Sequence, residues 1–212
     1  MNRYLIYIAS FLLMANLFAS CDEVEEVGLY DHWRPRNEAF IDSIHALAST
    51  RLVPQIADET ESGIKVSDIA VNEMFALETS ASTNEAKQYV YCKKIICNNE
   101  GKRPLHTDKV SAFYYGTNIL GEQFDGNFTG YSATDTQVLD KDGKKPTEFD
   151  SPTDFAVNGV IAGWITALQY MHPGERWMLY IPYQSAYGES DYNGILGYSA
   201  LTFDLVLEEV VK

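Results

Sequence analysis

Most enzyme signatures are missing from this sequence. It has three cysteines and four histidines, and the histidines are scattered, at His32, His45, His106 and His172. It contains no Gly-x-Ser-x-Gly elbow, Walker loop, His-Glu-x-x-His segment or Gly-x-Gly-x-x-Gly fingerprint. We therefore expect no metal and no cofactor, and any chemistry has to run without an activated nucleophile.

Basic residues are scarce as well. The chain has 16 Lys and Arg against 30 Asp and Glu, which gives a formal net charge of −14. Neutralising nucleic-acid phosphates takes clustered Lys and Arg, so we expect no nucleic-acid partner. The 46% hydrophobic and 13% aromatic residues are enough to fill a core, and 14 tyrosines suit sheet surfaces or a groove.

The apolar run from Leu5 to Phe18 is too short to cross a membrane, which takes about 20 residues. Arg3 precedes the run, so residues 1–20 are predicted to be an export signal. The adjoining Ala19-Ser20-Cys21 resembles a bacterial lipoprotein cleavage site, which implies a lipid anchor on Cys21 in the cell envelope. A plain signal peptide with an incidental cysteine is the alternative.

The acidic run over residues 22–26 is relevant to which membrane leaflet would hold the anchored protein. It is similar to the surface-export signal of some Gram-negative lineages, whereas in others it would favour retention at the inner membrane. We expect an envelope protein at the outer membrane, periplasmic or surface-exposed, and the sequence leaves the leaflet open.

The two remaining cysteines, Cys92 and Cys97, lie an odd number of positions apart in the sequence. On one continuous strand they would point to opposite faces, which argues against a bridge between them. No histidine or second cysteine pair stands at zinc spacing. We expect both to be free, and a disulfide across a bend is the alternative.

Residues 21–88 are predicted to be a tether and an N-terminal extension. An amphipathic helix is expected over residues 37–48, with Asn37 as its N-cap. Its apolar face carries Phe40, Ile41, Ile44, Leu47 and Ala48. We expect this face to pack against its own domain, and a dimer interface is the alternative. Residues 63–66 are a candidate strand, and residues 71–77 form an apolar patch.

Strand patterns begin at residue 89. Aromatic and β-branched residues predict strands over residues 89–92, 95–96, 109–115 and 121–126. The polar residues 129–151 are expected to form a long insertion. Loops beyond about 12 to 15 residues are uncommon and are often functional.

A short apolar strand around Phe155 and Val157, a helix from about Trp164 to Met171 and a second strand are predicted within residues 155–188. Apolar residues recur at the spacing of one buried helical face at Trp164, Ala167, Leu168 and Met171. Pro173 and Gly174 end this helix. Trp177, Leu179 and Ile181 then alternate with other residues, as on a strand buried on one side.

This stretch and its surroundings carry several motifs in a fixed order. They are Val160-Ile161-Ala162-Gly163-Trp164, Met171-His172-Pro173-Gly174-Glu175-Arg176, Ile181-Pro182, Ala186-Tyr187-Gly188 and Leu201-Thr202-Phe203-Asp204. In this order and at this spacing they resemble the signatures of FKBP-type peptidyl-prolyl isomerases. The resemblance extends upstream through residues 109–116 and Phe124-Asp125, so it covers residues 89–212.

The resemblance implies an α+β fold, in which an antiparallel twisted β-sheet wraps around a short α-helix. It also implies peptidyl-prolyl cis-trans isomerase activity, and chaperone-like holding, on proline-containing segments of exported proteins. The barrier to this reaction is loss of amide resonance, about 18 to 20 kcal/mol. It can be lowered without a nucleophile or a metal, because a twisted amide has less charge separation and is favoured in an apolar pocket.

The site residues follow from the resemblance, position by position. Asp125, Tyr187 and Tyr114 take the catalytic positions, with Asp125 at the rim beside the twisting amide and the Tyr187 hydroxyl donating to a substrate carbonyl. Trp164 forms the pocket floor. The substrate-binding positions around it are Phe124, Val160, Ile161, Ile195, Leu196 and Phe203. The backbone N–H of Ile161 is a second donor. Ordinary core packing is the alternative for the apolar members.

Three positions depart from the family pattern. Thr153 stands where an aromatic residue commonly lines the pocket, and Gly126-Asn127 replaces the usual small hydroxyl pair. Leu196-Gly197 replaces Ile-Pro in the loop that overhangs the pocket, and the insertion enters beside the site. These departures keep a second reading open, a catalytically weak binding lipoprotein that recognises an envelope partner.

Overall fold

The computed structural model describes residues 28–48, 50–55, 63–135 and 138–211. The predicted signal peptide and Cys21 lie outside the described residues. The chain divides into residues 1–31 and residues 32–212, and the features below belong to the second unit. Among the described helices, none combines the length and apolar character needed to cross a membrane.

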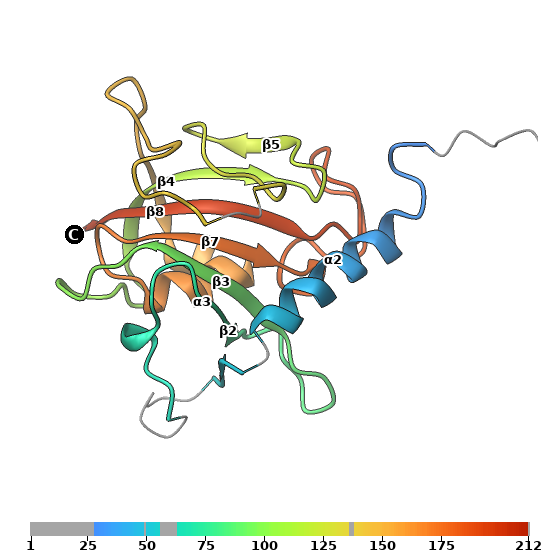
Figure 1. Ribbon diagram of the computed structural model, residues 1–212, viewed down its shortest axis with the longest axis horizontal. Coiled ribbons are helices and arrows are strands. Elements are labelled where there is room, and N and C mark those ends of the chain that lie inside the picture. The colour runs from blue at the N-terminus through green and yellow to red at the C-terminus, as the bar shows by residue number, and fades with distance from the viewer. Residues whose placement is uncertain (1–27, 49, 56–62, 136–137, 212) are drawn as a thin grey trace, which may run out of the picture. The chain divides into compact units, whose positions relative to one another are not determined.

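A mixed eight-stranded sheet forms the framework (Figure 1). Its hydrogen-bonded order is β1-β2-β3-β7-β8-β4-β5, and β6 pairs with β4 beside this path. The strands are β1 (Leu52–Val53), β2 (Met74–Glu78), β3 (Tyr89–Ile96), β4 (Lys109–Thr117), β5 (Gln123–Gly126), β6 (Thr153–Ala156), β7 (Arg176–Ile181) and β8 (Leu201–Val211). The strands predicted from residue 89 onward are thus present. Residues 89–96 form one strand rather than two.

The α-helices lie on opposite faces of the sheet. Helix α3 (Ala162–Tyr170) is behind the sheet in Figure 1, and α2 (Trp33–Ala48) is in front of it. Strand β7 was predicted to be buried on one side, but it is buried on both. Trp177 and Leu179 belong to the core on the α3 face, whereas Met178 and Tyr180 belong to a second core on the α2 face.

Helix α2 begins four residues before the predicted start. Phe40, Ile41 and Ile44 pack against the second core, so most of the apolar face is used within its own chain, as expected, whereas Leu47 is 63% exposed. The prediction of Asn37 as the N-cap is wrong, because Asn37 lies inside the helix with its side chain buried. The Asn37 amide donates to the carbonyl of Trp33 over 2.7 Å.

The N-terminal extension shares the sheet with the later strands. β2 pairs antiparallel with β3, and β1 pairs parallel with β2. Residue 88 is therefore not a boundary between two folded units, because hydrogen bonds continue the sheet across it. The apolar patch at residues 71–77 supplies most of β2, and the candidate strand at 63–66 is wrong, since Val66–Asp68 form a 3₁₀ turn, η1.

Both remaining cysteines are free, as expected. Cys92 is buried on β3 in the core on the α3 face, whereas Cys97 follows the end of that strand and is exposed. Burial raises the pKa of the Cys92 thiol well above its usual value. It is therefore an inert core residue.

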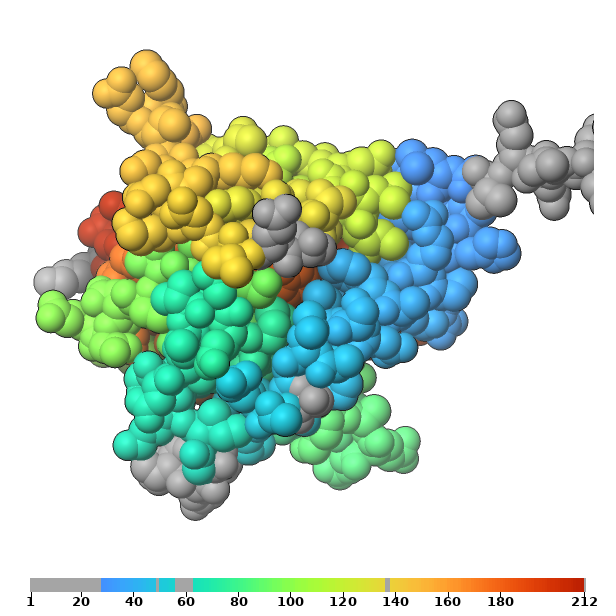
Figure 2. Space-filling view, in the orientation of Figure 1, coloured from blue at the N-terminus to red at the C-terminus, as the bar shows by residue number. Residues whose placement is uncertain are grey.

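Described residues of the insertion at 129–151 pack onto the α2 face of the sheet. Tyr131 and Leu139 belong to the second core, and Leu139 exchanges two backbone–side-chain hydrogen bonds with Asn72, of 2.9 and 3.2 Å. Figure 2 shows α2 in blue and the insertion in yellow to orange spread over the face turned to the viewer.

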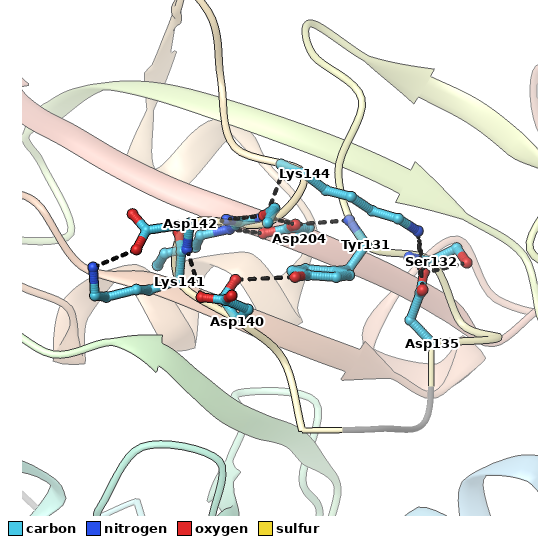
Figure 3. A network of polar contacts seen from close by, with 10 residues as sticks. Tyr131, Ser132, Asp135, Asp140, Lys141, Asp142, Lys144 and Asp204 are labelled. Carbon is cyan, nitrogen blue, oxygen red and sulfur yellow. Dashed lines mark hydrogen bonds and ion pairs between the residues drawn. The ribbon is translucent and has the colours of Figure 1, made fainter.

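A buried ion pair fixes the insertion to the sheet. Arg176 on β7 and Asp204 on β8 are 1% and 0% exposed and make two hydrogen bonds, of 2.8 and 2.6 Å. The remaining Arg176 donors reach insertion carbonyls, those of Gly143 at 3.0 Å and Lys144 at 2.9 Å. Asp204 also accepts the Tyr131 N–H at 2.8 Å, which is drawn in Figure 3.

Candidate active site

A cluster of aromatic rings lies where α3 meets β4, β6 and β8. The Trp164 indole is 3% exposed and contacts three rings edge-to-face, those of Tyr114, Phe155 and Phe203, at centroid distances of 5.2 to 5.4 Å. The Trp164 Nε1 atom is buried without a hydrogen-bond partner among the described residues. The accessible part of Trp164 is therefore apolar ring, which suits the floor of a pocket for an apolar group.

The local sequence explains how Trp164 is held. A Cβ atom on the preceding Gly163 would lie 2.7 to 3.0 Å from three Ile181 side-chain atoms, so only glycine lets α3 approach β7 this closely. Ile161 is the N-cap of α3, with extended backbone angles. Its backbone N–H has no partner among the described residues, as expected for a free donor at a helix start.

The opposite wall comes from β4 and β8, which pair antiparallel. Gly116 on β4 lies across from Phe203, and a Cβ atom there would be 2.8 Å from the rings of both Phe203 and Phe124. The missing side chain leaves room for those two rings, which meet edge-to-face at 5.5 Å. Phe124 thus supports Phe203 from behind.

One carboxylate stands at the rim of this wall. The Tyr114 hydroxyl donates to Asp125 Oδ1 over 2.9 Å, and the same oxygen accepts the Gly126 N–H at 2.8 Å. Desolvation, followed by this hydrogen bond, raises the pKa of Tyr114 to about 12. Tyr114 therefore remains a neutral donor, and its hydrogen bond orients Asp125 at the mouth of the pocket.

Two tyrosines form the other side of the mouth. The rings of Tyr187 and Tyr192 are stacked, 4.6 Å apart and tilted by 15°. Tyr187 is 39% exposed, and partial desolvation raises the pKa of its hydroxyl. Tyr187 thus presents a protonated hydroxyl beside the apolar floor.

These groups enclose a cavity of about 390 Å³. The predicted site residues that line it are Tyr114, Asp125, Val160, Ile161, Trp164, Tyr187 and Phe203, and the remaining lining residues are Phe155, Gly159 and Tyr192. Seven predicted residues from five separate places in the sequence are thus brought to one cavity. The three predicted catalytic residues are among them.

Three predicted residues are placed outside the cavity lining. Phe124 lies behind Phe203, and Ile195 packs against the core on the α3 face. Leu196 is 37% exposed on the overhanging loop. Tyr192 lines the cavity from that loop instead, and its aromatic side chain five residues after Tyr187 was the available sequence signal.

The pocket has an aromatic ring on β6 even though Thr153 stands at the position expected for one. Phe155, two residues further along β6, lines the cavity and contacts both Tyr114 and Trp164. Thr153 is exposed, and its hydroxyl accepts a hydrogen bond from Asn127 at 3.2 Å. Residues two apart on a strand share a face, so the aromatic wall is offset along β6 rather than lost.

The insertion was expected to enter beside the site, but the part that is described packs on the opposite face. Tyr131 and Leu139 lie in the core on the α2 face, whereas Trp164 and Phe203 lie in the core on the α3 face. None of the described insertion residues lines the cavity. Within the described residues, no cluster of three or more His, Cys, Asp or Glu is arranged to hold a metal ion.

An aromatic pocket between a short helix and a twisted sheet, with a carboxylate and a tyrosine at its mouth, is the arrangement that the sequence motifs implied. Residues 101–208 match the family model described as FKBP-type peptidyl-prolyl cis-trans isomerase. The chain belongs to this family. Its α+β, FKBP-like fold is confirmed by a crystal structure of a peptidyl-prolyl cis-trans isomerase from Pseudomonas syringae pv. tomato. That structure has a TM-score of 0.52 at 20% identity, and the match covers 87% of this chain and 98% of that one.

Relatives with curated names come from several bacteria. The FKBP-type 22 kDa peptidyl-prolyl cis-trans isomerase of Escherichia coli is 34% identical over 119 residues, which are 56% of this chain and 48% of the relative. The outer membrane protein MIP of Legionella longbeachae is 34% identical over 120 residues, 56% of this chain and 43% of the relative. The chain thus spans about half the length of these relatives.

Proposed function

We propose that the protein is a peptidyl-prolyl cis-trans isomerase that assists the folding of exported or surface proteins. The observation that carries this proposal is the convergence of Tyr114, Asp125, Trp164 and Tyr187 on one cavity of about 390 Å³. Core packing would account for the tryptophan alone. It does not require a carboxylate and two tyrosine hydroxyls at the mouth of the same cavity.

The proline ring of a substrate occupies the apolar space above Trp164, between Phe155, Val160 and Phe203. Entry removes water from the X-Pro amide and favours its twisted form, which has less charge separation than the planar form. The Ile161 N–H and the Tyr187 hydroxyl bind the flanking carbonyls and fix the peptide. Asp125 lies beside the twisting amide. A 10⁵-fold acceleration requires roughly 7 kcal/mol, which these interactions can supply together.

The proposal is tested with the purified full-length protein in a protease-coupled cis-trans assay on short X-Pro peptides. We expect a rate that increases linearly with protein concentration above the uncatalysed rate, because each folded molecule contributes one pocket. A rate equal to the background, with the protein shown to be folded by circular dichroism, would refute the enzyme.

A second function is a catalytically weak FKBP-like module that holds proline-containing segments or an envelope partner. The Leu196-Gly197 sequence in the overhanging loop favours this alternative, since Leu196 is exposed and is not among the residues that line the cavity. Such a module would bind X-Pro peptides without accelerating their isomerisation.

We also propose that a lipid on Cys21 anchors the protein in the cell envelope. The order of the export signal, small residues and cysteine supports this, and one relative is named an outer membrane protein. The substrates would then be proline-containing segments of exported proteins. A dimer through residues 37–48 would have to use the outward face of α2, because Phe40, Ile41 and Ile44 pack on its own sheet.

A further inference from the structure

The first turn of α2 contacts the loop that carries Tyr192. The Trp33 indole N–H donates to Ser199 Oγ over 3.0 Å, and the Asn37 side-chain oxygen accepts the Ala200 N–H at 2.8 Å. The Arg34 guanidinium lies 4.5 Å from the centre of the Tyr198 ring. Three successive loop residues are therefore bound by one helical turn, at a sequence separation of more than 160 residues.

Asn37 is unusual for its position. Asparagine is a poor residue for a helix interior, and burial of its amide is costly unless both ends are hydrogen-bonded. Here the side chain is 1% exposed, with its nitrogen bonded to Trp33 and its oxygen bonded to Ala200. A residue that is unfavourable for the helix itself is thus explained by its contact with the loop.

The contact continues from the base of the loop to the pocket. Ser199 Oγ donates to the Leu196 carbonyl over 2.6 Å, and Tyr198 N–H donates to the Gly188 carbonyl at 3.0 Å. Tyr192 and Ile195 exchange two backbone hydrogen bonds of 2.9 Å, which close the tip. The Tyr192 ring then stacks on Tyr187 at the pocket mouth.

We infer that Trp33 and Asn37 are positioning residues for the pocket: the N-terminal helix braces the loop over residues 188–200 and thereby holds Tyr192 against Tyr187. This inference rests on the proposed isomerase function for its effect on rate, but not for the brace itself. No residue of α2 lines the cavity, so α2 acts through the loop. The brace gives residues 33–48 a role in the site beyond covering the sheet.

The test compares Asn37→Ala with Ile44→Ala in the full-length protein. Both remove a side chain that docks α2, but Ile44 packs on the sheet, away from the loop. Amide hydrogen exchange reports the brace directly. We expect Asn37→Ala to speed exchange at Tyr192, Ile195 and Tyr198 about tenfold more than at β7, and Ile44→Ala to leave these loop amides at the wild-type rate.

Peptide kinetics give the second readout. A looser loop weakens binding of the residues that flank proline, so Asn37→Ala should raise KM roughly threefold to tenfold with little change in kcat. Trp33→Phe keeps an aromatic side chain and removes the indole N–H donor, so it should act in the same direction while folding normally. In a Ser199→Ala background, Trp33→Phe should cause no further increase in KM, because the hydrogen bond between these two side chains is already lost.

Equal exchange in the loop of Asn37→Ala and wild type would overturn the inference. So would the same acceleration in Ile44→Ala, because helix docking in general would then explain the effect. If wild type shows no isomerase activity, the proposed function fails, but faster loop exchange in Asn37→Ala would still support the brace.

Discussion

Asp125 is a carboxylate at the rim of an aromatic pocket, and Tyr114 holds it in place. The 2.9 Å hydrogen bond between them uses one carboxylate oxygen, and Asp125 lines the same cavity as Trp164. Tyr187 stands at the same mouth with a hydroxyl that remains protonated at neutral pH. The proposed reaction needs these groups to orient the peptide rather than to exchange protons with it.

At this scale we predict that Asp125→Ala and Tyr187→Phe each lower kcat/KM for X-Pro peptides roughly tenfold. One lost hydrogen bond of about 1.4 kcal/mol corresponds to that factor. Neither side chain lies in the buried core, so the urea midpoint should stay unchanged. Asp154→Ala, which removes an exposed carboxylate on β6 outside the cavity, is the matched control and should keep full activity. Unchanged rates in the first two variants would show that the site has been misplaced.

Tyrosine ionisation gives a prediction for alkaline pH. Burial raises the pKa values of Tyr91, Tyr114 and Tyr180 to about 12, above their usual value of about 10. The unfolded chain therefore loses these protons first, and stability falls as pH rises between about 10 and about 12. The urea midpoint should decrease over this window, and less steeply in Tyr180→Phe than in wild type. If the urea midpoint fell equally steeply with pH in both proteins, the raised pKa of Tyr180 would be contradicted.

The individual residues show how far sequence could predict the site. Seven lining residues were predicted because their motifs fix both residue type and position. Phe155 and Tyr192 were missed for a physical reason: a two-residue offset along a strand keeps the same face, and a loop tip is placed by its own hydrogen bonds. Neither residue belongs to the motifs from which the site was predicted.

Among the elements, the insertion is the one whose place depends most on a single ion pair. Arg176 and Asp204 come from motifs that the sequence presents as ordinary strand residues. In the folded chain they join β7, β8 and four insertion residues, Tyr131, Lys141, Gly143 and Lys144. Periodicity cannot predict such a contact, because it depends on two chain segments that meet only after the sheet has formed.

We predict that Arg176→Met destabilises the protein by about 3 to 5 kcal/mol, because it leaves the Asp204 carboxylate buried without its partner. Desolvation already raises the pKa of Asp204, and removing the Arg176 guanidinium raises it further. The loss should therefore be smaller at pH 5, where Asp204 can take up a proton, than at pH 8.

The matched control for this ion pair is Lys144→Ala. This substitution breaks the 2.8 Å ion pair between Lys144 and Asp135, in which the two side chains are 45% and 25% exposed. It should lower the free energy of unfolding by at most about 1 kcal/mol. Urea denaturation of both variants at the two pH values is the measurement. An Arg176→Met variant as stable as Lys144→Ala would show that the insertion is held by its apolar contacts instead.

The helices and strands of the FKBP-like region followed closely from sequence patterns, and the extension did not. Helix α2 was found by its apolar spacing, but its start was misplaced because Asn37 has the preferences of an N-cap. The prediction that β7 is buried on one side only was wrong. Its second face is covered by α2 and by the insertion, and a local sequence pattern cannot show where those segments pack. Local sequence patterns thus predicted the helices and strands better than they predicted which segments pack against each face.

At the scale of the whole molecule, the sequence predicts an export signal over residues 1–20 that is followed by a lipid anchor on Cys21. We predict that wild-type protein made in a Gram-negative host incorporates a radiolabelled fatty acid, whereas Cys21→Ser does not. Only Cys21 stands at the resembled cleavage site, so Cys97→Ser, which removes an exposed cysteine, is the matched control and should remain labelled. An unlabelled wild type would refute the anchor.

The central claim, that the aromatic pocket isomerises the X-Pro amide, is tested most directly by exchange NMR on a proline peptide at equilibrium. A catalytic amount of the full-length protein should speed cis-trans exchange far above the uncatalysed timescale of tens to hundreds of seconds. Asp125→Ala should reduce this rate roughly tenfold at the same concentration. Peptide chemical-shift changes that report binding, together with an exchange rate equal to that without protein, would contradict the isomerase activity. They would instead support the alternative of a binding module.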